Sequence, residues 1–428
     1  MSKYSLKFDR EKVDVEVPAE NLLGILESRD VPCAATEEEA IRKALENPIE
    51  SQRIGDKVKP GEKVCIVICD LTRSWQRTHV YLPLLVEEIK RGGARDEDIF
   101  FMSATGTHRA QTPEEHKALL GEELYKRYKI YDHDCEKDEM VDFGKTSFGT
   151  PIRLNKKVVD SDHVVITAGI AYHFMAGWGG GRKAILPGVA SYETVMANHA
   201  LALNPLPGKG RNMVCRSGNV DGNVIHMDML EAASKVEPSF LFNVVMNASG
   251  KIGWAVAGHW QKAYEAGIGI VDSVEAIDIP QLADLVVASA CGYPKDINLY
   301  QTSKAIFNAQ EAARPGGAVM VISACSEGYG NEEVQGMLQN FRNSDEREAE
   351  LRREFTIAKH VGYCVGETTE KYDFHLVTNM EASLLEGTGI QVSKTVDEAL
   401  GKVYAKHGKN LKTWLMPQGA NTLPKLAK

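Results

Sequence analysis

The sequence lacks most of the patterns that mark secreted, membrane or nucleic-acid-binding proteins. Its 428 residues include eight cysteines but no CxxC pair, which excludes a zinc ribbon and a dithiol redox motif. No apolar run approaches the roughly 18 to 20 residues that cross a bilayer, and the first residues form no apolar signal-peptide core. Lys and Arg (50) do not outnumber Asp and Glu (59), which disfavours nucleic acid and anionic membranes as partners. We therefore expect a cytoplasmic protein with a small ligand, whose cysteines are buried free thiols.

Standard nucleotide and metal fingerprints are also missing. No GxGxxG follows a strand, and no GK[ST] completes a P-loop. No HxxxH or HExxH pair supplies two metal ligands from one helix. A metal bound by this chain would need ligands from elsewhere.

What the chain does contain is an alternation of short β-branched runs and longer stretches with helical spacing, which is typical of α/β layers around mainly parallel sheets. The expected strands are 63–70, 98–106, 162–170, 240–247, 283–291, 318–325 and 374–380. The expected helices are 36–48, 79–93, 112–128, 191–203, 301–317 and 345–362. We predict an N-terminal α/β domain over residues 1–275 and a C-terminal, Rossmann-like α/β domain over 276–408. Residues 409–428 are expected to form an irregular tail that packs back on the N-terminal lobe.

Polar residues follow four of these strands. Ligands of open α/β sheets gather at the carboxyl ends of strands, so such positions are candidates for a site. Each one alone is also compatible with an ordinary turn or helix cap. The four segments are Asp70-Leu71-Thr72-Arg73, Gly106-Thr107-His108, Ala171-Tyr172-His173 and Gly292-Tyr293-Pro294-Lys295-Asp296.

A glycine-rich segment, GWGGGRKAILPG, begins at Gly177. Three glycines without side chains would let backbone N–H groups approach an anion, and the Arg and Lys that follow add positive charge. The segment therefore indicates a phosphate cradle, with a tight turn bearing solvated basic residues as the alternative.

Two further segments carry polar residues on expected helices. His199 lies on one stripe with Tyr192, Val195 and Leu203, as either a satisfied core histidine or a single metal ligand. In YQTSK, Gln301 and Lys304 are one helical turn apart. Lys304, together with Arg73, is suited to pairing with a substrate carboxylate, unless these are surface helix charges.

In order and spacing, the motifs DLTR, GTH, AYH with GWGGGRK, the NH of MANHA, and YQTSK resemble the nickel-pincer lactate racemase family from about Val64 to Lys304. The resemblance implies two α/β lobes with an active-site cleft between them. It implies an isomerase, a racemase or 2-epimerase of 2-hydroxyacids that works by reversible hydride transfer through a 2-keto acid. The implied cofactor is nickel bound to pyridinium-3-thioamide-5-thiocarboxylic acid mononucleotide.

The resemblance also assigns roles to residues. His108 and His173 become the acid/base pair, Lys183 the covalent tether of the cofactor, and His199 the nickel ligand. The substrate carboxylate falls to Arg73 and Lys304, supported by Gln301 and Tyr300. The remaining cofactor contacts are Asp70, Thr72, Gly179, Gly180, Gly181 and Arg182.

The chain departs from the family after Arg73, where Ser74-Trp75-Gln76 replaces a proline-containing turn. Trp75 is either a core anchor or a wall of the site. If it lines the site, the polar neighbours Gln76, Arg77 and His79 favour a substrate longer or more polar than lactate. Tyr363 is the candidate for the aromatic residue that the family places over the substrate.

The expected partners are a small 2-hydroxycarboxylate, the enzymes that mature the cofactor, and further copies of the chain in a homo-oligomer. Two alternatives remain open. A nicotinamide-dependent 2-hydroxyacid dehydrogenase is disfavoured by the absent GxGxxG, and an inactive cofactor-binding homologue by the retained pair of histidines. The sequence does not choose among lactate, longer aliphatic acids, malate and sugar acids.

Overall fold

The computed structural model describes residues 2–427, and the chain divides into two compact units. Unit 2 contains residues 30–202 and 213–274. Unit 1 contains the N-terminal segment up to Arg29, residues 203–212 and the chain from Glu275 onward. Each unit has its own six-stranded sheet, which confirms the α/β class with mainly parallel sheets.

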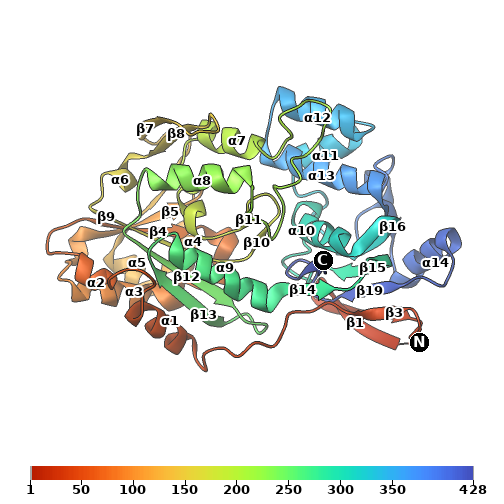
Figure 1. Cartoon of the computed structure of the whole chain (residues 1–428), viewed down its shortest axis with the longest axis horizontal. Coiled ribbons are helices and arrows are strands. Elements are labelled where there is room, and N and C mark those ends of the chain that lie inside the picture. Colours follow the sequence, from red (N-terminus) through yellow and green to blue (C-terminus); the bar gives the residue numbers. More distant parts are fainter. Residues whose placement is uncertain (1, 428) are drawn as a thin grey trace. The chain divides into compact units, whose positions relative to one another are not determined.

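The sheet of unit 2 has the order β13-β12-β9-β4-β5-β6, and all of these strands except β6 are labelled in Figure 1. All neighbours are parallel except β13, which runs antiparallel to β12. The central strand β4 is apolar throughout because both of its faces are covered. The strands are β4 (Val64–Cys69), β5 (Ile99–Ala104), β6 (Lys129–Asp132), β9 (His163–Gly169), β12 (Phe240–Met246) and β13 (Ile252–Gly258).

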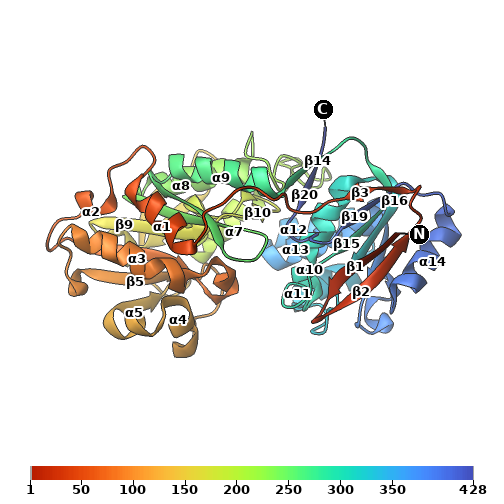
Figure 2. The ribbon, with the colours of Figure 1, turned by 90° about the horizontal axis from the view of Figure 1, so that it is seen from below.

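Helices cover both faces of this sheet. The apolar stripes of α1 (Glu37–Glu46) and α3 (Thr78–Arg91) join the strands in one large core, and α8 (Val224–Ser234) and α9 (Lys262–Glu275) lie on the opposite side (Figure 2). The other helices are α2 (Ile54–Lys57), α4 (Pro113–Leu120), α5 (Glu122–Arg127), α6 (Lys156–Val159) and α7 (Tyr192–Ala200). The short 3₁₀ helices are η1 (Leu71–Gln76), η2 (Asp96–Asp98) and η3 (Gly181–Ala184). Small antiparallel pairs join β7 (Met140–Lys145) to β8 (Pro151–Asn155) and β10 (Tyr172–His173) to β11 (Gly177–Trp178).

The sheet of unit 1 has the order β18-β17-β16-β15-β19-β3 and is parallel throughout. Its strands are β3 (Leu22–Ile25), β15 (Ala283–Ser289), β16 (Ala313–Ile322), β17 (Asp373–Val377), β18 (Gln391–Ser393) and β19 (Thr413–Met416). The helices are α10 (Leu299–Ala309), α11 (Glu332–Gln339), α12 (Ser344–Arg353), α13 (Ile357–Lys371) and α14 (Val396–His407), with η4 (Gln310–Ala312) and η5 (Ala382–Leu385). A hairpin of β1 (Ser2–Phe8) and β2 (Glu11–Val17) and the parallel pair of β14 (Ala276–Ile279) and β20 (Leu423–Leu426) complete the unit.

The structure corrects the predicted domain limits and tail. Residues up to 29 belong to unit 1, because β3 adds to the edge of its sheet beside β19. The segment 203–212 also belongs there: the carboxylate of Glu348 accepts the N–H groups of Gly208 and Gly210 at 2.8 and 2.7 Å. The tail is not irregular, and it belongs to unit 1. It supplies β19 to the interior of the unit 1 sheet and β20 to the pair with β14.

Several expected helices are shorter or broken. The expected helix over 112–128 divides at Gly121, which has φ +78° and ends α4. The one over 345–362 divides at Thr356, whose extended backbone and side chain cap α13 through the N–H of Lys359. The one over 301–317 ends at Ala309, and β16 then begins at Ala313, earlier than expected.

All eight cysteines are free, as expected, but only four are buried, and Cys33 is exposed. No helix within residues 2–427 is long and apolar enough to span a bilayer.

Candidate active site

Three of the predicted strand ends meet at one edge of the unit 2 sheet. Strand β4 lies between β5 and β9, and all three are parallel, so their carboxyl ends share one edge. Asp70 follows β4, the loop with His108 follows β5, and His173 follows β9 on β10. The convergence predicted for these residues is therefore present within unit 2.

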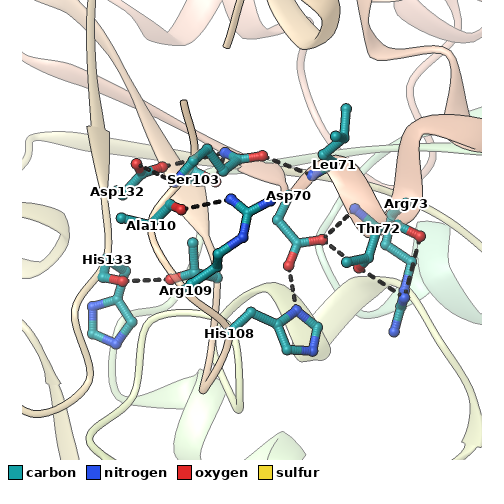
Figure 3. A network of polar contacts seen from close by, with 12 residues as sticks. Asp70, Leu71, Thr72, Arg73, Ser103, His108, Arg109, Ala110, Asp132 and His133 are labelled. Atoms are coloured by element: carbon teal, nitrogen blue, oxygen red, sulfur yellow. Dashed lines mark hydrogen bonds and ion pairs between the residues drawn. The ribbon is translucent and has the colours of Figure 1, made fainter. Parts of the chain in front are cut away.

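Asp70 and His108 form a direct pair, which Figure 3 shows. The Nδ1 atom of His108 contacts Oδ2 of Asp70, and Oδ1 of Asp70 accepts the backbone N–H of Thr72 at 3.0 Å and its hydroxyl. The Asp70 side chain is 7 % exposed, whereas that of His108 is 48 % exposed. Burial acts to raise the pKa of Asp70, but the hydrogen bonds from His108 and Thr72 outweigh it and hold the pKa below its ordinary value. Asp70 is thus a buried carboxylate that holds an exposed imidazole.

Gln111 ties the two loops of this pair together and was missed by the sequence reasoning. Its Oε1 atom accepts the N–H of Leu71 at 2.7 Å, and its Nε2 atom donates to Ser103 at 2.7 Å and to Asp132 at 3.2 Å. No sequence signal marks Gln111, because its partners come from other strand ends.

His173 contacts hydrogen-bond donors, whereas His108 contacts a carboxylate. Its Nδ1 atom accepts the backbone N–H groups of Met175 and Ala176 at 3.3 and 3.1 Å. Desolvation lowers the pKa of His173 well below its ordinary value, and the charges of Lys183, His199, Arg73 and Arg182 lower it further. The ring is neutral around pH 7.

The predicted role of Arg182 as an anion-binding residue is wrong. The side chain is fully buried, and its guanidinium donates to the carbonyl groups of Trp178 at 2.9 Å and Ala176 at 2.7 Å. It also contacts the hydroxyl of Tyr264 and lies 4.6 Å from the centre of that ring. Arg182 therefore holds the glycine-rich segment in shape, and its one unpaired donor, Nε, is buried with the rest of the side chain.

The glycines of this segment do not form the predicted open cradle either. The N–H of Gly179 donates to Ala171 at 2.7 Å, and the N–H of Gly181 donates to the side chain of Asn243 at 2.9 Å. Gly181 has φ +54°, and a Cβ there would lie 2.6 Å from the Tyr264 ring. Close packing and a left-handed backbone require glycine here, so the segment is a tight turn, but the basic residues that follow it are buried or half-buried and not solvated.

Lys183 follows Arg182 on η3 and is half-buried. Desolvation lowers the pKa of its amine well below the ordinary value, and the charges of Arg182 and Arg73 act in the same direction. A lysine whose amine readily loses its proton is a suitable nucleophile for covalent attachment.

His199 is buried on α7, with 2 % of its surface exposed. Its Nδ1 atom lies 2.9 Å from the carbonyl oxygen of Val195 and therefore donates to it, which leaves the lone pair on Nε2, the form that binds metals. Desolvation, with a contribution from Lys183, lowers the pKa of His199 to about 3. Among residues 2–427, no group of three or more His, Cys, Asp or Glu is placed to hold a metal ion.

Arg73 and Trp75 lie on η1, directly after Asp70. Arg73 is half-buried, and its Nη1 atom donates to Thr72 Oγ1 at 3.0 Å. Trp75 is 36 % exposed, and its ring lies against Gly169 at the end of β9, with Cη2 2.8 Å from the position of a Cβ there. Trp75 therefore lines the sheet edge that carries the two histidines.

Of the polar neighbours of Trp75, Gln76 lies against Gly169 beside it, with its Cγ atom 2.8 Å from the position of a Cβ there. Gln76 is only 2 % exposed, and Arg77 forms a two-point ion pair with Glu37 at 2.6 and 3.0 Å. The exposed part of this turn at the sheet edge is the ring of Trp75, and the preference for a longer or more polar substrate stays a prediction.

The remaining predicted residues lie in unit 1. Tyr300, Gln301 and Lys304 are on α10 after β15, and Nζ of Lys304 donates to Oε1 of Gln301 at 2.9 Å. Asn298 caps the helix through the N–H of Gln301. Tyr363 is buried in α13, with 1 % exposed, close to Gly210, and serves as a core residue of unit 1.

Residues 8–210 match the lactate racemase N-terminal domain, and residues 279–423 match the lactate racemase C-terminal domain. The chain therefore belongs to the lactate racemase family, and it is an isomerase of the racemase type.

Named relatives and solved structures agree with this assignment. The lactate racemase of Thermoanaerobacterium thermosaccharolyticum is 34% identical over 335 residues, which cover 78% of this chain and 76% of that protein. The lactate racemase of Lactiplantibacillus plantarum is 30% identical over 99% of this chain and 100% of its own length. The lactate racemase apoprotein structure from T. thermosaccharolyticum superposes with a TM-score of 0.91 at 29% identity, covering 99% of this chain and 100% of that one. A Thermotoga maritima protein shares the fold, with a TM-score of 0.64 at 18% identity over 92% of this chain and 98% of its own.

Proposed function

We propose that the chain is a racemase or 2-epimerase of 2-hydroxyacids, with lactate as the first substrate to test. The observation that carries this proposal is the pair His108 and His173, which follow the two strands on either side of β4, one held by Asp70 and the other by backbone N–H groups. Inversion at a carbon that bears a hydroxyl needs proton-transfer groups that face the substrate from two directions. Lactate is favoured because relatives that match most of the chain bear that name, and because Trp75 presents an apolar wall.

We assign the following roles to individual residues. Arg73 binds the substrate carboxylate, for which its planar guanidinium is suited. His108 and His173 exchange protons with the oxygen at C2. Lys304 of unit 1, supported by Gln301 and Tyr300, is proposed as the second carboxylate ligand.

The residues fit a nickel-pincer nucleotide at two points. Lys183 would hold it covalently through its amine, and His199 would bind the nickel through Nε2, because Nδ1 is committed to Val195. When bound, this cofactor supplies the group that accepts and returns the hydrogen at C2 as hydride, which avoids a carbanion next to a carboxylate. The glycine-rich segment does not fit the phosphate, since the N–H groups of Gly179 and Gly181 are already bonded within the chain.

The partners that follow are a small 2-hydroxycarboxylate and the enzymes that build and insert the cofactor. We propose a cytoplasmic location, which suits eight free cysteines.

The function is tested with protein matured in a host that makes the cofactor. Single enantiomers of lactate, malate and gluconate are incubated with it, and the products are separated by chiral chromatography. We expect inversion of lactate, and a loss of about 10² to 10⁴-fold in His108→Ala and in His173→Ala. His259→Ala, at an exposed histidine of the same unit, is the control. Near-normal inversion in either active-site variant would contradict the assignment.

Cofactor attachment is tested separately by intact-mass spectrometry. Matured wild-type protein should carry an adduct that is absent from Lys183→Ala and retained in Lys262→Ala, a change at a lysine on α9. An adduct that survives in Lys183→Ala would place the tether elsewhere.

A further inference from the structure

We infer that the two active-site histidines present opposite proton states to the substrate: Nε2 of His108 is a proton acceptor, and Nε2 of His173 carries a hydrogen and is a donor. This inference rests on the proposed function for its kinetic consequence. The proton positions themselves follow from the hydrogen-bond partners of each ring.

For His108 the deciding partner is Asp70. An ionised carboxylate only accepts hydrogen bonds, and Asp70 is ionised because its pKa is held below the ordinary range. The hydrogen between the two side chains therefore sits on Nδ1 of His108. In the neutral ring this leaves the lone pair on Nε2, on the far side of the ring from Asp70 (Figure 3). Because Thr72 also donates to Asp70, the carboxylate is fixed and holds this form.

For His173 the deciding partners are two backbone N–H groups. Amide N–H groups can only donate, so the Nδ1 atom that receives Met175 and Ala176 must keep its lone pair. A neutral ring then carries its hydrogen on Nε2. A ring turned by 180° would place a C–H against both amides and would lose both hydrogen bonds.

The charges around His173 keep the ring from gaining a second proton. Desolvation lowers its pKa most, and the guanidinium charges of Arg73 and Arg182 lower it further. Protonation at Nδ1 would also oppose the two amide N–H groups. His173 is therefore held as a neutral donor, whereas the ring of His108 faces the carboxylate of Asp70.

This asymmetry predicts different kinetics for the two enantiomers. When the substrate hydroxyl faces His108, its O–H bond breaks and an N–H bond forms at Nε2, giving an imidazolium bonded to Asp70. When the hydroxyl faces His173, it meets a donor that binds its oxygen but does not take its proton. Proton transfer then requires the ring hydrogen to move to Nδ1, with loss of both amide hydrogen bonds.

A thermodynamic constraint sharpens this prediction. Two enantiomers of one stereocentre have equal free energy, so kcat/KM must be the same in both directions. The enantiomer that faces His173 must therefore have both a lower KM and a lower kcat, by one common factor. Loss of two backbone hydrogen bonds makes that factor on the order of 10- to 100-fold.

The proton positions are tested by NMR on the full-length protein labelled with ¹⁵N at histidine, before maturation. Couplings between ring nitrogens and carbon-bound hydrogens report which nitrogen is protonated, and His108→Gln and His173→Gln assign the two rings. We expect hydrogen on Nδ1 of His108 and on Nε2 of His173. Hydrogen on Nδ1 of His173, or on Nε2 of neutral His108, would overturn the inference.

Asp70→Asn should switch His108 to the Nε2–H form, because the new amide group donates to Nδ1. A catalytic histidine held in the wrong tautomer loses activity, so kcat should fall by about 10³ to 10⁴-fold. Glu62→Gln is the matched control: it alters a carboxylate–histidine pair with His163 (2.8 Å) at the start of β9, and should leave the His108 signals unchanged. Equal kcat values for the two enantiomers in the matured wild type would also overturn the inference. If matured protein inverts no hydroxyacid while the ring signals are as expected, the proposed function fails and the proton assignment stands.

Discussion

Arg182→Met should loosen the glycine-rich segment that carries Lys183, while leaving unit 1 intact. Arg182 makes two short bonds from a charged donor, to Trp178 and Ala176, and such bonds contribute roughly 1.5 to 3 kcal/mol each. Replacing the arginine also removes the cost of burying its charge, which offsets part of the loss. We therefore expect a net destabilisation of about 2 to 4 kcal/mol, which is less than the sum of about 3 to 6 kcal/mol for the two bonds.

Hydrogen exchange measured by mass spectrometry resolves this effect by region. Since about 1.4 kcal/mol corresponds to tenfold, protection of peptides from residues 171–190 should fall by about 30- to 700-fold. Peptides from β15 and β16 of unit 1 should be unchanged and serve as an internal reference. Arg153→Met is the matched control, because Arg153 is 44% exposed and pairs only at the surface with Asp142 and Glu193; we expect about twofold or less. Protection of 171–190 within threefold of wild type would refute the structural role of Arg182.

Three further predictions follow from single positions. In urea unfolding, Gly181→Ala should destabilise the protein by more than Gly144→Ala. Both glycines have positive φ, but a Cβ at Gly181 would meet the Tyr264 ring, whereas nothing lies within 4 Å of a Cβ at Gly144. Equal losses of stability would show that backbone strain alone matters. Asp373, 8% exposed, is held by one lysine and two histidines, which outweigh burial and lower its pKa to about 2. The ionised Asp373 should contribute about 2 kcal/mol to the free energy of unfolding above pH 4, and this contribution should be lost as the pH falls towards 2. The difference in stability between wild type and Asp373→Asn should therefore vanish over that range. A difference that persists at pH 2 would contradict this. Trp75→Ala should raise kcat/KM for 2-hydroxyacids longer than lactate relative to lactate, and an unchanged ratio would remove Trp75 from the substrate pocket.

The strands were predictable because most are buried on both faces and so appear as continuous apolar runs. β4, β9 and β15 were each identified this way. Elements whose place depends on distant partners were not predictable. β19 has only four residues and is followed by a proline, so the sequence does not mark it as a strand. Its place inside the sheet depends on its pairing with β15 and β3.

The same contrast between local sequence patterns and distant partners applies to the candidate site. His108 and His173 could be predicted from the sequence, because each is a polar residue that comes shortly after an apolar run. The role of Arg182 was not visible, since its partners include Tyr264, 82 residues away, and a basic residue after glycines has the same appearance whether it binds an anion or its own backbone. Gln111 was missed for the same reason.

One measurement tests the central claim directly: inversion of lactate deuterated at C2, in ordinary water, by the matured protein. If hydrogen leaves C2 as hydride and returns to the other face, the product of opposite configuration retains deuterium at C2, while its hydroxyl hydrogen comes from water. Mass spectrometry of the separated enantiomers reads the deuterium content at C2, because the hydroxyl hydrogen exchanges freely with water. Inverted lactate that has exchanged its C2 deuterium for hydrogen would show removal as a proton and contradict the account.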